Sequence, residues 1–175
     1  PSSAASDVYK RQAIYYYDID SGENSLFYGE KNPEENYSLS FVGEENTPLI
    51  RVINGSEEEN HYIIKRGDVW ELATPKNIAS FDYQDNDEEG LFFLTNFEAP
   101  NYRLVKILYT GEVVEIIPET DLALKSISIL DDFIITNSIN TDMNSMVEFY
   151  SKEGALLDLK IPDDIEGTLS AFSCP

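Results

Sequence analysis

A strand-rich unit that recurs every 40-odd residues most constrains the fold of this chain. Apolar runs that would open each unit begin near Tyr37, Ile78, Lys125 and Thr168, at steps of about 41, 47 and 43 residues. Four short strands at a fixed period of about 40–50 residues are the sequence signature of a β-propeller blade. We therefore expect an all-β fold of antiparallel four-stranded sheets that follow one another along the chain.

The strand–turn pattern predicts a partial β-propeller with about three complete blades and two partial ones. The expected strands are 14–19 and 26–28 in the first, partial blade; 37–42, 49–53, 62–65 and 69–73; 78–83, 91–95, 102–108 and 113–117; 126–130, 133–136, 146–150 and 155–161; and 168–172 in the last, partial blade. The pattern begins and ends within a blade, so we expect the chain to be a piece of a larger protein.

The third and fourth blades superpose in sequence. Phe93 matches Ile135, Leu104 matches Val147 and Gly111 matches Gly154, at separations of 42 and 43 residues. The two glycines are expected in the tight turns before each outermost strand, where glycine supplies the positive φ that hairpins need. The best helix candidate is 118–124, which we interpret as a connection between blades.

Residues 1–12 carry small residues and no trace of the repeat, and they resemble a translated adapter sequence. We set this leader apart as non-native or disordered, the alternative being a genuine flexible arm, and assign 13–175 to the propeller domain.

The charge of the chain limits its partners. Acidic residues number 33 against 12 basic ones, which gives a formal net charge of -21. Such a chain offers no cationic surface to displace the counterions of nucleic acid or to attract anionic lipid, so neither is expected as a partner. The acidic residues fall mostly in turns, which favours solvated loop tips over a cation-binding or peptide-attracting face.

No catalytic constellation can be assembled from these residues. The sequence has one histidine, His61, so a metal site with several histidines is ruled out. We expect His61 to be a surface or turn residue whose ring nitrogens are hydrogen-bonded. The one cysteine, Cys174, lies one residue from the end of the sequence, and no G-x-S-x-G nucleophile elbow occurs. We assign no catalytic residue, no cofactor and no metal ligand.

Two acidic segments, 18–24 and 85–90, are weakly similar to calcium loops. A calcium loop needs alternating oxygen ligands, a glycine at the sixth position and a bidentate glutamate at the twelfth. The first segment has Gly22 at position five, and the second has Asn96 at position twelve. Acidic hairpin turns are the expected structure.

A single cysteine cannot form an internal disulfide, and no apolar run approaches the 18 or so residues of a membrane span. With no visible signal peptide, we expect a cytoplasmic location.

The segment 95–107, with the sequence TNFEAPNYRLVKI, resembles the T-N-x-x-A-P-N-Y-R-L signature in the propeller of prolyl oligopeptidase-type serine peptidases. Its residues are typical of a hairpin corner, in which Asn96 bonds local backbone, Pro100 fixes φ and Asn101 takes an unusual turn angle. Flanking stretches at 26–30, 90–94, 115–119, 154–157 and 160–162 are similar to blade ends of that family. The resemblance spans roughly 13–175, about half of a seven-bladed ring.

The resemblance implies a propeller that caps a separate α/β-hydrolase domain and admits only short peptides. In the family the serine, aspartate and histidine of the triad belong to that hydrolase domain, so none is carried over. Members that cleave after proline also use an Arg and a Cys between the second and third strands of a middle blade. The matching stretch here, 54–60, has neither residue, which leaves no substrate contact to assign. The signature residues Asn96, Pro100, Asn101 and Arg103 are then expected to be fold markers rather than substrate-facing groups.

Two functional hypotheses follow. One is a fragment of the substrate-gating propeller of a cytoplasmic serine-type endopeptidase. The other is a non-enzymatic propeller that binds a protein partner on its loop face. A sugar-active propeller finds no support, since no Asp-box-like repeat recurs at blade spacing.

Overall fold

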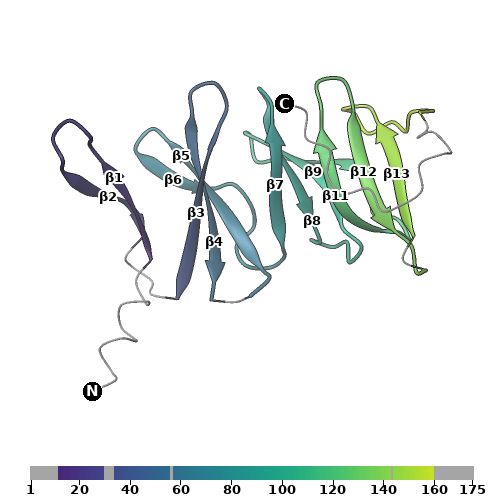
Figure 1. The fold of residues 1–175 in the computed structure, drawn as a ribbon, viewed down its shortest axis with the longest axis horizontal. Coiled ribbons are helices and arrows are strands. Elements are labelled where there is room, and N and C mark those ends of the chain that lie inside the picture. Colours follow the sequence, from purple (N-terminus) through teal and green to yellow (C-terminus); the bar gives the residue numbers. More distant parts are fainter. Residues whose placement is uncertain (1–11, 30–33, 56, 143, 160–175) are drawn as a thin grey trace, which may run out of the picture. The chain divides into compact units, whose positions relative to one another are not determined.

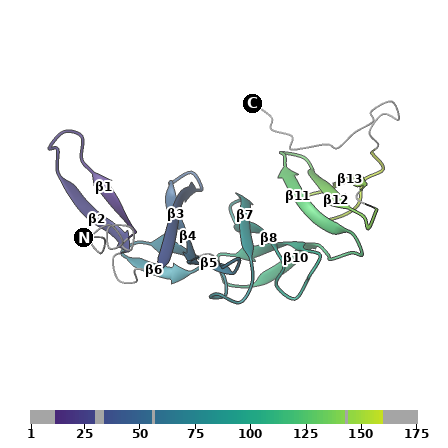
Figure 2. The same ribbon diagram turned by 60° about the horizontal axis from the view of Figure 1, so that its bottom comes forward.

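The strands lie in four antiparallel sheets, which the computed structural model describes over residues 12–29, 34–55, 57–142 and 144–159 (Figures 1 and 2). The chain divides into two compact units, Pro1–Ser80 and Phe81–Pro175, and each is described separately. The described residues contain no helix, and therefore none long and apolar enough to cross a membrane.

The first unit holds a two-stranded and a four-stranded sheet. Their strands are β1 (Ala13–Tyr17) and β2 (Asn24–Gly29), then β3 (Glu35–Val42), β4 (Thr47–Asn54), β5 (Asn60–Arg66) and β6 (Val69–Leu72). Within the larger sheet the spatial order follows the sequence, as expected for hairpin-linked strands of one blade.

Aromatic rings join these two sheets. The Trp70 ring lies 5.6 Å from Phe27 and 5.0 Å from Tyr28, both edge-on. They pack against buried Ile50 and Val52. Edge-to-face aromatic pairs add to the stabilisation from buried apolar area.

The second unit holds a four-stranded and a three-stranded sheet. Their strands are β7 (Phe81–Asn86), β8 (Gly90–Thr95), β9 (Arg103–Leu108) and β10 (Val113–Ile117), then β11 (Ala123–Ile129), β12 (Ile134–Ile139) and β13 (Ser145–Tyr150). A shared apolar core lies between them, with Leu104 and Ile134 fully buried. The expected partial propeller is confirmed, with differences at a few strands.

The inner strand expected at 78–83 begins later. Ile78 is 56% exposed, and Ala79 forms an isolated bridge with Asn60 of β5, so β7 starts only at Phe81. The segment 118–124 contains no helix and connects two sheets as expected, but the strand expected at 126–130 begins earlier, because β11 starts at Ala123 and ends at Ile129.

The outermost strand expected at 155–161 is reduced, among the described residues, to a single bridge between Leu156 and Tyr150. Its last residues and the strand expected at 168–172 lie outside the described residues, as do residues 1–11 of the leader.

The two sheets of the second unit repeat at a constant offset of 43 residues. Leu91 pairs with Ile107 in one sheet, and Ile134 pairs with Tyr150 in the other. The following turns match at the same offset, because Gly111 N donates to Leu108 O as Gly154 N donates to Ser151 O.

The sequence match of Phe93 with Ile135 was therefore wrong by one residue. The position equivalent to Phe93 is Thr136. Side chains alternate across a strand, so a one-residue slip assigns a side chain to the opposite face. Phe93 packs its ring 6.1 Å from Phe81, on the face of its sheet away from the shared core, and Thr136 lies on the corresponding face of the next sheet.

Candidate functional site

The corner between β8 and β9 carries the recognised signature, and Asn101 ties it to the next connection. Its backbone N–H donates to Glu119 Oε1 at 2.6 Å, and its Nδ2 donates to Thr120 O at 3.0 Å. Leu124 N donates to Asn101 O at 2.9 Å. Three hydrogen bonds therefore fasten this corner to the segment that leads from β10 into β11, which gives Asn101 a structural role.

The unusual backbone angle lies beside Asn101 rather than at it. Glu98 has φ 51° and Tyr102 has φ 70°, while Asn101 is absent from the positive-φ residues. Tyr102 N donates to Ala99 O at 2.8 Å and Ala99 N donates to Asn96 O at 3.1 Å, so two successive turns impose these angles. The expectation for Asn101 was wrong because its side chain bonds the neighbouring connection instead of its own turn. Exposed Pro100 fits the expected turn position.

Arg103 is held by carboxylates. Its guanidinium lies 2.9 Å from Glu115 and 3.9 Å from Glu98, and its side chain is 19% exposed. A substrate carboxylate would have to compete with two existing partners, so we assign Arg103 to the stability of the corner.

The loop at 54–60, where the family resemblance would have put substrate contacts, is anchored at Gly55 by one backbone and one side-chain hydrogen bond. Gly55 N donates to Glu34 O at 2.8 Å, and Gly55 O accepts from Asn36 Nδ2 at 3.0 Å. Its glutamates at 57–59 are exposed. The loop presents acidic groups to solvent.

His61 is buried, contrary to the expectation of a surface or turn histidine. It is 4% exposed within central strand β5, and its Nδ1 lies 2.6 Å from Asn77 Oδ1. Burial lowers the pKa of His61 below its usual 6.5, although the bond to Asn77 acts in the opposite direction. Because a neutral imidazole bonded to an amide lacks the nucleophile and carboxylate of a triad, His61 is a structural residue.

The two acidic segments form hairpin turns. Asp18 Oδ1 accepts from Asp20 N and Ser21 N, and Asp87 Oδ1 accepts from Glu89 N and Gly90 N. In the described ranges no three His, Cys, Asp or Glu side chains gather as metal ligands would.

Lys106 pairs with the second of these turns. Its Nζ lies 2.7 Å from Asp87 Oδ2 and 2.6 Å from Glu89 Oε2, and its side chain is 9% exposed. Burial would raise the pKa of Asp87, but the hydrogen bonds from Lys106 and the backbone outweigh burial and lower it. The lysine thus stabilises the β7–β8 turn.

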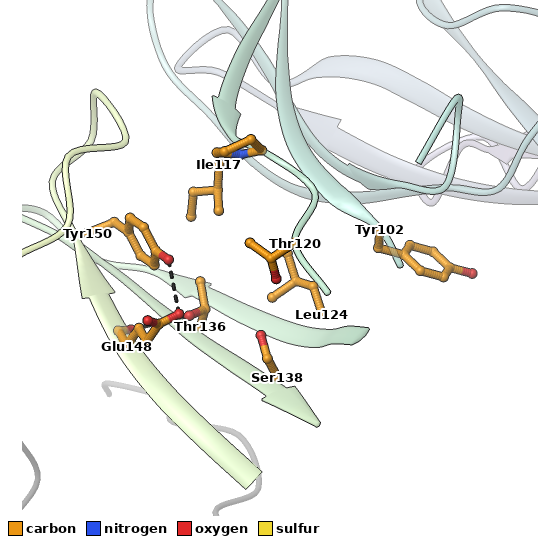
Figure 3. Close-up of a pocket in the computed structure, with 9 residues that line it drawn as sticks. Tyr102, Ile117, Thr120, Leu124, Thr136, Ser138, Glu148 and Tyr150 are labelled. Carbon is orange, nitrogen blue, oxygen red and sulfur yellow. Dashed lines mark hydrogen bonds between the residues drawn. The ribbon is translucent and has the colours of Figure 1, made fainter. Parts of the chain in front are cut away.

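A small cavity, partly open to solvent beside exposed Pro118 and Thr120, lies between the two sheets of the second unit, and no sequence pattern had indicated it (Figure 3). Polar side chains of β12 and β13 line it: Thr136, Ser138, Glu148 and Tyr150. Apolar Ile117 and Leu124 border it, while the ring of Tyr102 points away in Figure 3. The signal that could have revealed it is the run of Ile134, Thr136 and Ser138, which places hydroxyls at alternate positions of a buried strand.

Comparisons with known proteins agree with this fold. The profile described as "Prolyl oligopeptidase, N-terminal beta-propeller domain" matches residues 2–174. The prolyl endopeptidase of Dictyostelium discoideum is 27% identical over 195 residues, which cover 94% of this chain and 25% of that protein.

Solved structures share this fold. A chain from a mechanistic study of two prolyl endopeptidases superposes with a TM-score of 0.74 at 16% identity, covering 86% of this chain and 24% of its own. Prolyl oligopeptidase B from Galerina marginata, bound to a 35mer hydrolysis and macrocyclization substrate, gives a TM-score of 0.74 at 20% identity, covering 87% and 24%. Its apo form gives 0.73 at 18% identity, covering 92% and 26%.

At these identities the solved structures establish the fold, and the chain spans about a quarter of the length of the relatives it matches. The family profile covers nearly every residue of the chain, from 2 to 174. The chain belongs to the N-terminal β-propeller domain family of the prolyl oligopeptidases.

Proposed function

We propose that this chain is part of the substrate-gating propeller of a serine-type endopeptidase that cleaves short peptides. The observation that carries the proposal is the family match over residues 2–174. In this proposal the catalytic α/β-hydrolase domain lies in the remainder of the parent protein and is the covalently linked partner of the propeller.

The chain itself contributes no catalytic group in this proposal. Its sole histidine is buried against Asn77, and its corner arginine, Arg103, is held between Glu115 and Glu98. Its role is to restrict entry to the active site, because a folded protein is larger than the opening of a packed propeller. The relative from Dictyostelium discoideum is a prolyl endopeptidase, and the matched structure of prolyl oligopeptidase B is bound to a 35mer substrate, which supports peptides as the substrate class.

The proposal covers cleavage after proline and cleavage after a basic residue. The loop at 54–60 carries three exposed glutamates at 57–59 and no Arg or Cys. We further propose a cytoplasmic location for the parent, supported by a cysteine content of one, which requires no oxidising compartment.

The test uses the full-length parent enzyme and two matched substrates. One is a fluorogenic peptide of about ten residues, in separate versions with proline and with arginine before the scissile bond. The other carries the same cleavage sequence within a folded protein domain. We expect cleavage of the short peptide only, and labelling of one serine by a phosphonate probe.

Two results would overturn the proposal. Equal cleavage of peptide and folded domain would remove the gating role. A parent protein that takes no serine label, but captures a protein partner through this chain, would favour a non-enzymatic binding propeller.

A further inference from the structure

The contact between the two sheets of the second unit changes from apolar to polar along β12. Ile134 is fully buried in the shared core, Thr136 is 1% exposed and Ser138 is 5% exposed. Alternate residues of a strand share one face, so the two hydroxyls lie on the same face as Ile134. Buried hydroxyls in folded proteins are nearly always hydrogen-bonded, so both need partners.

Ser138 has no such partner among the described residues. Thr136 Oγ1 reaches Glu148 O at 3.4 Å, a long bond, whereas Ser138 Oγ bonds to no described group. Ser138 nevertheless lines the cavity together with Thr136. The cavity is therefore the candidate location for a partner of this hydroxyl.

Glu148 brings a carboxylate to the same cavity. Its Oε2 accepts from the Tyr150 hydroxyl at 3.0 Å, the bond drawn in Figure 3, and no cation pairs with it in the described ranges. Burial, together with this bond, raises the pKa of Tyr150 to about 12, so the phenol remains the donor. An ionised carboxylate has about four lone-pair sites, and one hydrogen bond leaves the others open.

The size of the cavity selects its occupant. Its volume is about 10 Å³, close to the room that one water molecule needs, and a buried water makes two to four hydrogen bonds. We propose that one ordered water occupies this cavity, accepts a hydrogen bond from Ser138 and donates one to Glu148. The polar end of the contact between the sheets is then held by a water bridge.

A metal cation is the less favoured occupant. A bound Ca²⁺ takes six to eight oxygen ligands, several of them carboxylates, whereas this cavity has one carboxylate and apolar walls at Ile117 and Leu124. A water molecule can accept a hydrogen bond from the Ser138 hydroxyl and donate one to the Glu148 carboxylate at the same time. A cation binds oxygen lone pairs and cannot accept the hydrogen bond of Ser138. The inference concerns the packing of the two sheets and does not depend on the proposed peptidase function.

The test is a double-mutant cycle on the full chain. Tyr150→Phe is present in all four proteins, so that the direct hydrogen bond from Tyr150 to Glu148 is absent from each of them. Ser138→Ala is made with Glu148 and with Glu148→Met. The two side chains share no direct hydrogen bond, so a hydrogen-bonded coupling between them must pass through a bridging molecule. We expect Ser138→Ala to lower the folding equilibrium constant about three- to tenfold with Glu148 present, and to change it less than twofold with Glu148→Met.

Thr141→Ala is the matched control, because Thr141 is an exposed loop residue. It should leave the folding constant unchanged in both backgrounds. An equal effect of Ser138→Ala in both backgrounds would overturn the proposal.

Two measurements on the unmutated chain remain decisive if variants fail to fold. A high-resolution crystal structure should show one water within hydrogen-bonding distance of Ser138 Oγ and Glu148, and an empty cavity would refute the bridge. The melting temperature should be the same in sodium, potassium and choline chloride at one ionic strength. A gain specific to sodium or potassium would replace the water by a cation.

Discussion

Two glycines at equivalent positions of the repeat permit a controlled test of the sheet packing. Gly111 and Gly154 both follow the third strand of a sheet, with φ 91° and φ 86°. A Cβ at Gly111 would meet nothing within 4 Å, whereas a Cβ at Gly154 would collide with the backbone carbonyl oxygen of Ile116. The backbone strain of an alanine is thus shared by the two positions, and only the neighbour differs.

The magnitudes follow from these two terms. An L-residue in the left-handed region costs about 1–2 kcal/mol, which we expect for Gly111→Ala. Gly154→Ala adds the displacement of the β10 backbone, which costs about 1–3 kcal/mol for a contact of this kind. We therefore expect Gly154→Ala to destabilise the chain by about 2–5 kcal/mol, and by more than Gly111→Ala.

The assay is urea unfolding of both variants and of the unmutated chain, monitored by far-ultraviolet circular dichroism, which reports the sheets of both units. The fluorescence of Trp70 serves as a second probe, because the single tryptophan lies in the first unit. The loss in Gly154→Ala should appear in the dichroism signal. Equal destabilisation by the two alanines would refute the packing of Gly154 on β10.

Four further outcomes are expected. The free energy of unfolding should fall as the pH drops below about 6.5, the pKa of His61 in the unfolded chain, because the unfolded chain then binds a proton that buried His61 does not. The variant His61→Gln should have a flatter dependence of stability on pH between pH 6.5 and 5. An unchanged dependence would contradict the burial of neutral His61. Lys106→Met should lower the free energy of unfolding by about 1–2 kcal/mol, less than the loss of a fully buried ion pair, because Glu89 is 75% exposed. Above about 0.5 M salt, where exposed charges are screened, this destabilisation should no longer change with salt concentration. Glu119→Ala should destabilise the chain by about 1–2 kcal/mol, because Asn101 N–H loses its acceptor. Glu98→Ala removes only a 3.9 Å contact with Arg103 and should be near neutral. If Glu98→Ala lowered the melting temperature more than Glu119→Ala, the hydrogen bond of Asn101 to Glu119 would not be what stabilises the corner. As part of a larger propeller, residues 13–175 expressed alone should bind a hydrophobic dye and melt broadly, and a sharp reversible melt above about 60 °C would argue for a self-sufficient domain.

Local patterns were sufficient to predict most strands of this fold. The run 91–95 and its return at 102–108 are bounded by turn residues, and the structure has β8 and β9 there to within one residue. These strands are specified by hydrophobic runs and by glycine and asparagine turns, which act over a few residues. The same patterns could not show that Thr136 is the position equivalent to Phe93, because both faces of these strands are largely buried and the alternation leaves no polar face to identify.

The candidate site was harder to predict for a related reason. The burial of His61 depends on Asn77, sixteen residues away, and the role of Asn101 depends on Glu119, eighteen residues away. The buried hydroxyl of Ser138 becomes informative only when the neighbouring sheet closes over it. Contacts across sheets lie outside any short motif, so a sequence pattern names the residue types without their partners.

The three hydrogen bonds at Asn101 also bear on the order in which the sheets form. They join partners only 18 and 19 residues apart in the case of Glu119 and Thr120, so the loop that each one closes is short and its entropy cost is small. The carbonyl that receives Leu124 N–H belongs to Asn101, which the turns around Ala99 hold in position. The corner of the first sheet in the second unit therefore supplies a docking point for β11, the first strand of the following sheet.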